Sequence, residues 1–340
     1  MPGSEGTEQR AQTPTIRDVA RHAGVSPATV SRVLNDLPLV TGATRERVLQ
    51  SIEELDYRPS AAARGLTSGR WHAVGVVAPF FTSASAVERL SGVAERLAES
   101  AYSLVMHDVE TLEQRAEALA AFARPDRVDG LLVISLPLAD DEHAALEHDD
   151  FPIVLIDVSD ASHPDLAIDD VHGGRLATDH LLAGGHARIG FVGDAPANPF
   201  GFTSSEDRRR GYLRALRGAG IEPLMELQQR GPHGRVEAQR LAERLLDLVD
   251  PPTAIFAASD MQAVGVMEAV RARGLRMPDD VAVVGFDDIE LAEIVGLTTV
   301  RQPLRESGRR GAELLLARLE GRAPEGAPLT SLALVERRTA

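Results

Sequence analysis

From Trp71 onward, short apolar runs alternate with longer amphipathic stretches. The apolar runs are continuous in Val, Ile and Leu, as expected for strands buried on both faces of a parallel sheet. The amphipathic stretches then supply the crossover helices. The expected strands are 73–79, 102–107, 128–135, 153–158, 188–193, 253–258 and 281–286. The expected helices include 85–100, 110–123, 170–184, 205–219, 235–248 and 260–273.

These strands are too many for one hydrophobic core. A single sheet would need one very large core, whereas cores stop growing at roughly 250–300 residues. Two doubly wound parallel sheets, each with its own core, fit the pattern better. The sequence therefore predicts an α/β body of two lobes.

Residues 15–56 follow a different pattern, in which turns separate short helices. Thr15 and Asp18 form a capping box for a first helix, which Gly24 ends. Ser26-Pro27 places an N-cap and a first-turn proline at the start of a second helix, and a third runs from about Thr41 to Leu55. Two short helices joined by a glycine-containing turn are typical of a helix-turn-helix that binds DNA. The alternative is a small helical cap on the body.

The net charge of −15 weighs against a nucleic-acid partner, because binding a duplex requires neutralised phosphates. The charge is unevenly distributed, however. Residues 15–72 carry eight Arg against six Asp and Glu, whereas residues 73–340 carry 27 Arg against 43 acidic residues. Any DNA contact is therefore expected to be confined to the N-terminal segment.

Several classes of protein are disfavoured by what the sequence lacks. The chain has no cysteine, so disulfides and thiolate chemistry are excluded. No apolar run in the sequence approaches the roughly 20 residues of a bilayer helix. Residues 1–14 lack the apolar stretch of a secretory signal, and no phosphate-binding loop, zinc-protease or nucleophile-elbow motif occurs. We expect a cytoplasmic protein that is not an enzyme, with no cofactor, metal or membrane contact.

Four stretches of sequence carry a family resemblance. GVSPATVSRVLN and the following TRERVLQSIEELDYRPSAAARGLTSGR resemble the headpiece of the LacI/GalR (lactose/galactose-repressor) family of transcriptional regulators. LLAGGHARIGFVGD and VVGFDDIELAEIVGLTTVRQP are similar to the body of that family. The resemblance covers about residues 15–338. It implies a small all-α headpiece, a hinge helix and a two-lobed body like a periplasmic sugar-binding protein.

The resemblance also implies where the parts begin and end. Residues 1–14 are expected to be a disordered tail. The other parts are a headpiece at 15–58, a hinge helix or linker at 59–72 and the body at 73–340. Lobe 1 is expected at about 73–168 and 302–327, and lobe 2 at about 169–301 and 328–340.

In the headpiece, Pro27 and Ala28 match positions that read base edges, and Arg32 matches a basic one. Because Pro27 and Ala28 offer only apolar contact, base readout depends more on Arg32, which can pair bidentately with guanine. The further DNA-contact candidates are Thr15, Thr29, Ser31 and Asn35, the last three matching phosphate contacts. In the hinge, the resemblance implies that Leu66 wedges into the minor groove of a palindromic operator, with Ala62 and Ala63 small enough for close approach.

In the body, ligands are expected at the carboxyl ends of the parallel strands. Five of the nine Phe residues fall in loops there, and flat rings beside carboxylates and a guanidinium suit a sugar. The positions that match the family's effector contacts are Asp157, Arg208, Ser259, Phe286, Asp287 and Gln302. Phe80 and Phe81 follow the first strand and join the ligand candidates, with core packing as the alternative. Asp260 is expected to cap the next helix.

The resulting prediction is a homodimeric repressor that binds double-stranded DNA and is controlled by a small molecule, a sugar by preference. The dimer is expected to form through the faces of helices such as 85–100 and 260–273. A sugar- or solute-binding protein without a regulatory role is the alternative that the body alone would support. An α/β enzyme is a third reading, which no catalytic motif supports.

Overall fold

The computed structural model describes residues 14–34, 37–57, 70–122, 127–146, 151–159, 162–323, 329 and 331–340. These residues belong to two compact units, 1–71 and 72–340. Most of the predicted tail lies outside the described residues, as do the DNA-contact candidates Asn35, Ala62, Ala63 and Leu66.

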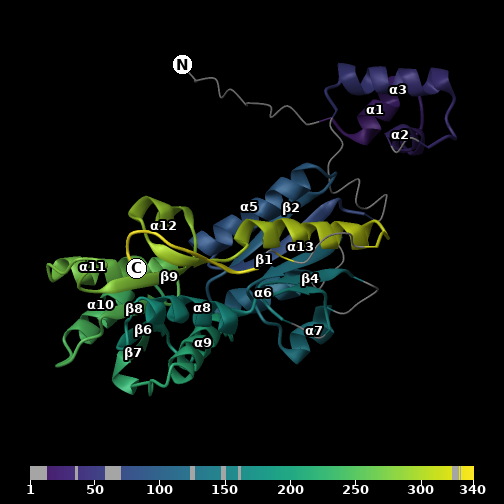
Figure 1. Cartoon of the computed structure of the whole chain (residues 1–340). Coiled ribbons are helices and arrows are strands. Elements are labelled where there is room, and N and C mark those ends of the chain that lie inside the picture. Colours follow the sequence, from purple (N-terminus) through teal and green to yellow (C-terminus); the bar gives the residue numbers. More distant parts are fainter. Residues whose placement is uncertain are drawn as a thin grey trace, which may run out of the picture. The chain divides into compact units, whose positions relative to one another are not determined.

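The N-terminal unit contains the helices α1 (Ile16–Ala23), α2 (Pro27–Leu34) and α3 (Gly42–Glu54) (Figure 1). The Asp18 carboxylate accepts hydrogen bonds from the backbone N–H and the hydroxyl of Thr15, at 2.9 and 2.7 Å. Gly24 ends α1 in the left-handed conformation, with φ of 65°. The core of the unit is formed by Val19, Ala20, Ala23, Val30, Val33, Val48 and Tyr57. The predicted capping box and helices are confirmed.

The body contains two separate sheets, as predicted. The first has the strand order β2-β1-β3-β4-β5 and is parallel throughout. Its strands are β1 (Ala73–Pro79), β2 (Ser103–Val109), β3 (Gly130–Ile134), β4 (Ile153–Ile156) and β5 (Asp165–Leu166). Together with α5 (Ala84–Ala98), α6 (Leu112–Phe122), α7 (Asp140–Leu146) and α13 (Leu304–Leu319), this sheet forms lobe 1.

The second sheet has the strand order β11-β10-β9-β8-β6-β7 and defines lobe 2. Its strands are β6 (Ile189–Asp194), β7 (Gln228–Gly231), β8 (Ala254–Ala257), β9 (Ala282–Asp287), β10 (Thr298–Arg301) and β11 (Ala333–Val335). Only β11 pairs antiparallel. The helices of lobe 2 are α8 (Asp170–Ala183), α9 (Ser204–Gly218), α10 (Arg235–Leu246), α11 (Asp260–Ala272) and α12 (Glu290–Val295), with the 3₁₀ turn η1 (Met225–Leu227).

The chain passes between the lobes three times. It leaves lobe 1 after β5, returns after β10 to form α13, and crosses again to reach β11. In lobe 1, α13 lies alongside α5 (Figure 1). The end of β10 and the start of α13 are therefore placed where the two lobes meet.

The predicted elements of the body are confirmed, with ends that agree to within two residues. The sequence pattern did not predict the edge strand β7, which reads Gln-Gln-Arg-Gly and has no apolar run. It also gave no strand at β5, where two residues suffice to pair with β4. Both are edge strands, which need no apolar side chains on both faces. The expected strands also lack β10, which lies inside the second sheet.

The contact between α5 and α13 requires glycine. A Cβ atom on Gly308 would lie 1.8 Å from the backbone oxygen of Arg89, and one on Gly92 would lie 1.9 Å from that of Arg305. Both distances are far below van der Waals contact with atoms that cannot rotate away. This close approach fixes Arg89 of α5 against the segment that enters α13.

Gly308→Ala should therefore force the two helices apart and lower the free energy of unfolding by about 1–3 kcal/mol. Gly218→Ala is the matched control, because Gly218 ends α9 with nothing within 4 Å of its would-be Cβ. The control should leave stability unchanged or raise it by up to about 1 kcal/mol. Urea unfolding of both variants decides the matter, and equal destabilisation would contradict the close-packing argument.

Candidate functional site

The backbone is strained where several strands end. Positive φ values occur at non-glycine residues after β1, β3 and β4 of lobe 1 and at the end of β9 of lobe 2. These residues are Phe80 (48°), Ser135 (53°), Asp157 (66°), Asp287 (122°) and Asp288 (60°). Each such conformation costs roughly 1–3 kcal/mol and is typical of binding and catalytic sites. The strain therefore marks the strand ends at which the sequence predicts a ligand.

A continuous chain of polar contacts joins the two lobes at this place. The Ser135 hydroxyl donates to the Asp157 carboxylate at 2.7 Å, and Arg89 contacts the other oxygen of Asp157 at 2.7 Å. Arg89 also donates to Gln302 Oε1 at 2.9 Å. The Gln302 amide in turn donates to Asp287 Oδ1 at 2.5 Å. Arg89, Gln302 and Asp287 are all buried, so these contacts are made away from water.

Arg208 continues this chain in lobe 2. Its Nε donates to Asp170 Oδ1 at 2.7 Å, and its Nη1 donates to the backbone oxygen of Ala258 at 2.7 Å and lies 3.6 Å from Asp287. The guanidinium lies over the Phe286 ring, 3.7 Å from its centroid. This cation–π contact and the two carboxylates hold a buried cation in one orientation.

The charges of this cluster perturb one another. Burial alone would lower the pKa of Arg208, but the charges of Asp170 and Asp287 raise it. Burial raises the pKa of Asp170 to about 6, even though Arg208 opposes the change. Burial also raises the pKa of Asp287, against the effect of Arg208 and of the hydrogen bond from Gln302.

Arg208 lies within α9, as the predicted helix at 205–219 implies. The expectation about Asp260 is wrong. The cap of α11 is Ser259, whose hydroxyl accepts a hydrogen bond from the backbone N–H of Gln262 at 3.2 Å. Asp260 is instead fully buried.

Asp260 acts as an acceptor between elements of lobe 2. It accepts from the backbone N–H of Ile289 at 3.0 Å and from the Thr299 hydroxyl at 2.5 Å. Burial, followed by the charge of Asp287, raises the pKa of Asp260 well above its ordinary value. It therefore braces β10 and the segment that follows β9 rather than capping α11.

The aromatic candidates divide into three environments. Phe286 is fully buried and supports Arg208. Phe81 is half-buried and packs against the core of lobe 1, and its backbone N–H donates to Asp108 at 3.2 Å. Phe80 is 41% exposed, and its ring meets the ring of Phe200 edge-on at 5.6 Å. Phe80 of lobe 1 thus touches the loop that follows β6 of lobe 2.

That loop is also held by Arg115 of α6. The guanidinium donates to the backbone oxygen of Phe200 at 3.2 Å and to that of Pro137 at 2.6 Å, and it pairs with Glu142 at the start of α7. The ring of Phe202 stacks on Phe200 at 5.4 Å. The lobes are therefore in contact at this point as well as through Arg89.

Some residues of the site were missed by sequence reasoning. His233, in the loop after β7, lies with its Nδ1 2.9 Å from Asp194 Oδ1, and the Gln262 amide donates to the same oxygen at 2.8 Å. Asp194 ends a predicted strand and could have been found by the rule that named Asp157. Arg89 lies in the middle of an amphipathic helix, where nothing in the pattern marks it.

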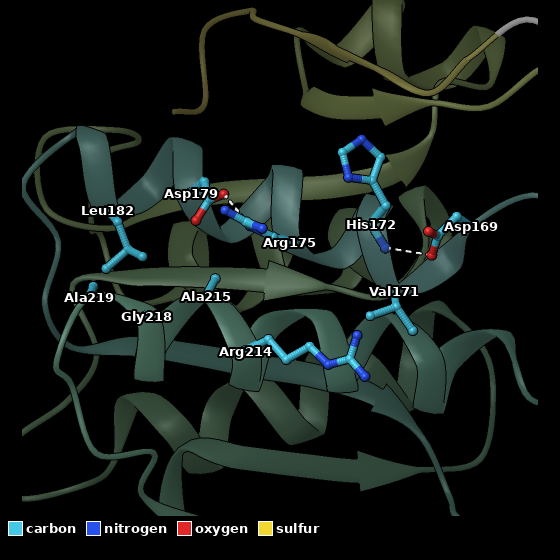
Figure 2. A pocket seen from close by; sticks show the side chains of 10 residues that line it. All are labelled: Asp169, Val171, His172, Arg175, Asp179, Leu182, Arg214, Ala215, Gly218 and Ala219. Carbon is cyan, nitrogen blue, oxygen red and sulfur yellow. Dashed lines mark hydrogen bonds and ion pairs between the residues drawn. The ribbon is translucent and has the colours of Figure 1, made fainter.

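A cavity of about 570 Å³ lies away from this site, between α8 and α9, as Figure 2 shows. Its walls are mixed in charge, and Arg175 turns to Asp179 on its own helix at 3.1 Å. None of the predicted ligand residues lines it. Among the described residues, no group of three or more His, Asp or Glu is arranged to hold a metal ion.

The second helix of the N-terminal unit presents a distinct outer face. Val30 and Val33 are buried against α1 and α3, whereas Pro27, Ala28 and Arg32 are exposed. The Thr29 hydroxyl lies 2.9 Å from that of Ser26, at the start of the helix. Thr15 is exposed and Ser31 is half-buried. The predicted base-reading side chains thus share the solvent-facing side of α2.

Comparisons with known proteins cover both units. The family described as bacterial regulatory proteins, lacI family, matches residues 15–60, and a periplasmic binding protein-like domain matches residues 178–340. The transcriptional repressor PurR of Aliivibrio salmonicida is 35% identical over 92% of this chain and 94% of its own length. This chain belongs to the lacI family. It is a DNA-binding transcriptional regulator of the repressor type.

Other lacI-family relatives agree with this assignment. The probable repressor ExuR of Bacillus subtilis is 32% identical over 89% of this chain and 91% of its own. A Lac repressor dimer solved with operator and the anti-inducer ONPF has a TM-score of 0.82 at 30% identity, covering 96% of this chain and 99% of its own. A CelR–cellobiose complex has a TM-score of 0.70 at 31% identity, covering 96% and 100%. The predicted headpiece and two-lobed α/β body are confirmed.

The described part of the lacI-family chain contains no helix that is long and apolar enough to span a bilayer.

The contact between Asp194 and His233 predicts a pH-dependent contribution to stability. Its hydrogen bond raises the pKa of His233 above the ordinary value of 6.5, which partial burial opposes. Such a group contributes stability that is full below pH 6.5 and is lost as the pH rises through the raised pKa. His233→Gln should therefore lower the melting temperature more at about pH 6 than at about pH 8.5. Calorimetry at both values, with the exposed His172→Gln as control, would contradict the argument if the losses were equal.

Proposed function

We propose that this lacI-family protein is a homodimeric repressor whose operator affinity is controlled by a sugar bound between the two lobes. The observation that carries the proposal is the polar chain from Ser135 and Asp157 in lobe 1 to Asp287 and Arg208 in lobe 2. Carboxylates at strand ends of both lobes, together with the guanidinium of Arg208 on α9, offer acceptors and donors to the hydroxyl groups of one ligand. The site residues are Asp157, Arg208, Ser259, Phe286, Asp287 and Gln302, with Phe80 and Phe81 at its edge.

The relatives support a sugar as the ligand. CelR was solved with cellobiose, and a Lac repressor structure, 30% identical to this chain, contains ONPG. In our proposal the ligand binds one arrangement of the lobes better than the other. A ligand shifts an equilibrium only by such a difference in affinity. The three connections between the lobes would then transmit that difference to the headpiece.

Exposed apolar side chains support dimer formation. Val87 on α5 is 45% exposed, and three consecutive residues of the edge strand β2, Leu104, Val105 and Met106, are each more than one-third exposed. An edge strand with exposed apolar residues invites pairing unless it is covered. We propose that a second copy covers this part of lobe 1, and that the faces of helices 85–100 and 260–273 contribute.

The proposal extends to the segments between the two units. We propose that the headpiece spans 15–58 and the hinge 59–72, with Leu66 in the minor groove of a palindromic operator and Ala62 and Ala63 permitting close approach. Since chromosomal DNA is the partner, we propose a cytoplasmic location. We also propose that the protein has no enzymatic role, because its relatives are named as repressors. A solute-binding protein without regulation remains the alternative, and the headpiece argues against it.

The proposal is tested with operator DNA selected from random sequence by the purified protein. Its binding is followed by fluorescence anisotropy while a panel of saccharides is added. At least one saccharide should change the operator affinity, downward for an inducer and upward for a corepressor. Operator binding that no saccharide alters would contradict sugar control, and an absence of sequence-specific binding would favour the solute-binding alternative.

Arg208→Ala should weaken binding of the active saccharide by roughly 10–100-fold, since a hydrogen bond to a charged group contributes about 1.5–3 kcal/mol. The same variant should lose ligand control of the operator. If the ligand is an inducer, the variant represses and fails to release; if it is a corepressor, the variant fails to repress. Calorimetric titration measures the loss, with the exposed Arg175→Ala of α8 as control. Unchanged affinity in folded Arg208→Ala protein would place the site elsewhere.

Arg32→Ala should weaken operator binding by about 5–150-fold, the equivalent of about 1–3 kcal/mol for a bidentate contact with guanine. Binding to random DNA should fall much less, because that term depends on phosphate contacts. Arg47→Ala, which removes an exposed arginine from α3 of the same unit, is the control. Equal losses in the two variants, on operator and random DNA alike, would show that Arg32 contributes only charge.

A further inference from the structure

The cluster between the lobes holds more carboxylates than cations. Among the described residues, Asp157, Asp170 and Asp287 are joined to only two guanidinium groups, those of Arg89 and Arg208. A fourth carboxylate, Asp260, is buried in the same lobe as Asp287, and burial followed by the charge of Asp287 raises its pKa. The site therefore has an excess of negative charge before any ligand enters.

The charge of each arginine is already matched. Arg89 contacts Asp157 at 2.7 Å and donates to Gln302, while its buried Nε has no acceptor among the described residues and is sealed from the surface. Arg208 contacts Asp170 at 2.7 Å and Asp287 at 3.6 Å. The contacts of Arg208 leave its Nη2 as a donor. Such a donor suits the neutral oxygen of a hydroxyl group, because no uncompensated positive charge accompanies it.

The carboxylates show what a further negative charge would meet. Burial raises the pKa of Asp170 to about 6, and the charge of Asp157 adds to the effect. The pKa of Asp287 is raised by burial first and by Asp157 as well. Ionisation of Asp170 and Asp287 is therefore already disfavoured in this environment. A ligand anion at the same place would be opposed by the same burial and the same neighbours.

A further titratable group at this edge, His233, does not reverse the balance. His233 lies close enough to Asp287 and Arg208 for their charges to affect it. Its Nδ1 is hydrogen-bonded to Asp194, so the protonated ring and that carboxylate together carry no net charge. Arg115, the other arginine that bridges the lobes, is paired with Glu142.

We propose that the effector is an uncharged, hydroxyl-rich molecule, a neutral saccharide, and that the carboxylate excess between the lobes excludes sugar acids and sugar phosphates. This inference rests on the proposed function and narrows its ligand class. Specificity then has two sources: like-charge repulsion disfavours anionic ligands, and hydrogen bonding favours neutral saccharides. Asp170 contributes to this charge balance because its carboxylate pairs with the guanidinium of Arg208 at 2.7 Å.

The test is a calorimetric and thermal-shift comparison of matched compounds with the full chain. The neutral members are glucose, galactose, cellobiose and lactose, and the charged members are glucuronate, galacturonate, glucose 6-phosphate and galactose 6-phosphate. The best-binding neutral compound should bind at least about 100-fold more tightly than any charged one. A charged compound that equals or exceeds every neutral one would overturn the inference while leaving effector control intact. A panel with no binder at all would instead contradict the proposed sugar effector, and this inference with it.

A second test changes the charge of the site instead of the charge of the ligand. Asp170→Asn keeps the shape of the side chain and removes one negative charge, which leaves two carboxylates, Asp157 and Asp287, with the two guanidinium groups. The affinity gap between the neutral and the charged compounds, which is the ratio of their dissociation constants, should narrow by at least about tenfold. The change should come chiefly from tighter binding of glucuronate or galacturonate. Asp179→Asn removes a carboxylate from the same helix, where it pairs with Arg175 outside the cluster, and should leave the gap unchanged. An unchanged gap in folded Asp170→Asn protein would overturn the inference.

Discussion

The contact of Arg89 with both Asp157 and Gln302 is the interaction on which the arrangement of the body depends. It joins the end of β4 in lobe 1 to the segment that leads from β10 of lobe 2 back into α13. Arg89 can reach both partners because glycines at 92 and 308 let α5 and α13 approach at backbone distance. A larger side chain at either position would displace the helix that carries Arg89, and with it the connection between the lobes.

From Gln302 the same contacts lead through Asp287 to Arg208 and Asp170. Because each member is buried and has at least one partner, a change at one end alters the environment of the next. Buried polar networks of this kind are strengthened by low local dielectric, and each unpaired member is costly for the same reason. The positive φ values at Asp157 and Asp287 add strain that the surrounding contacts must offset. These features describe a site that is organised before a ligand arrives.

The site could be predicted from the sequence only in part. Asp157, Asp287 and Gln302 lie at or directly after strand ends, and the carboxyl edge of a parallel sheet is a place the chain itself reveals. Arg208 was found through the family resemblance, and its place inside α9 agrees with the amphipathic stretch at 205–219. Asp260 was taken for a cap because it follows a strand and precedes a helix, whereas the neighbouring Ser259 has that role.

The sequence by itself determined the two units, most of the helices and strands, and the family. Apolar periodicity and turn residues reflect interactions between residues close together in the sequence, so they can be recognised without any knowledge of the fold. Only the tertiary structure decided that Arg89 and Asp170 belong to the site, that Phe286 supports a guanidinium, and that carboxylates outnumber cations between the lobes. Those properties come from residues far apart in the chain, such as Arg89 and Gln302, that are brought together in the fold. Charge balance and burial depend on distances across the fold, which no local pattern records.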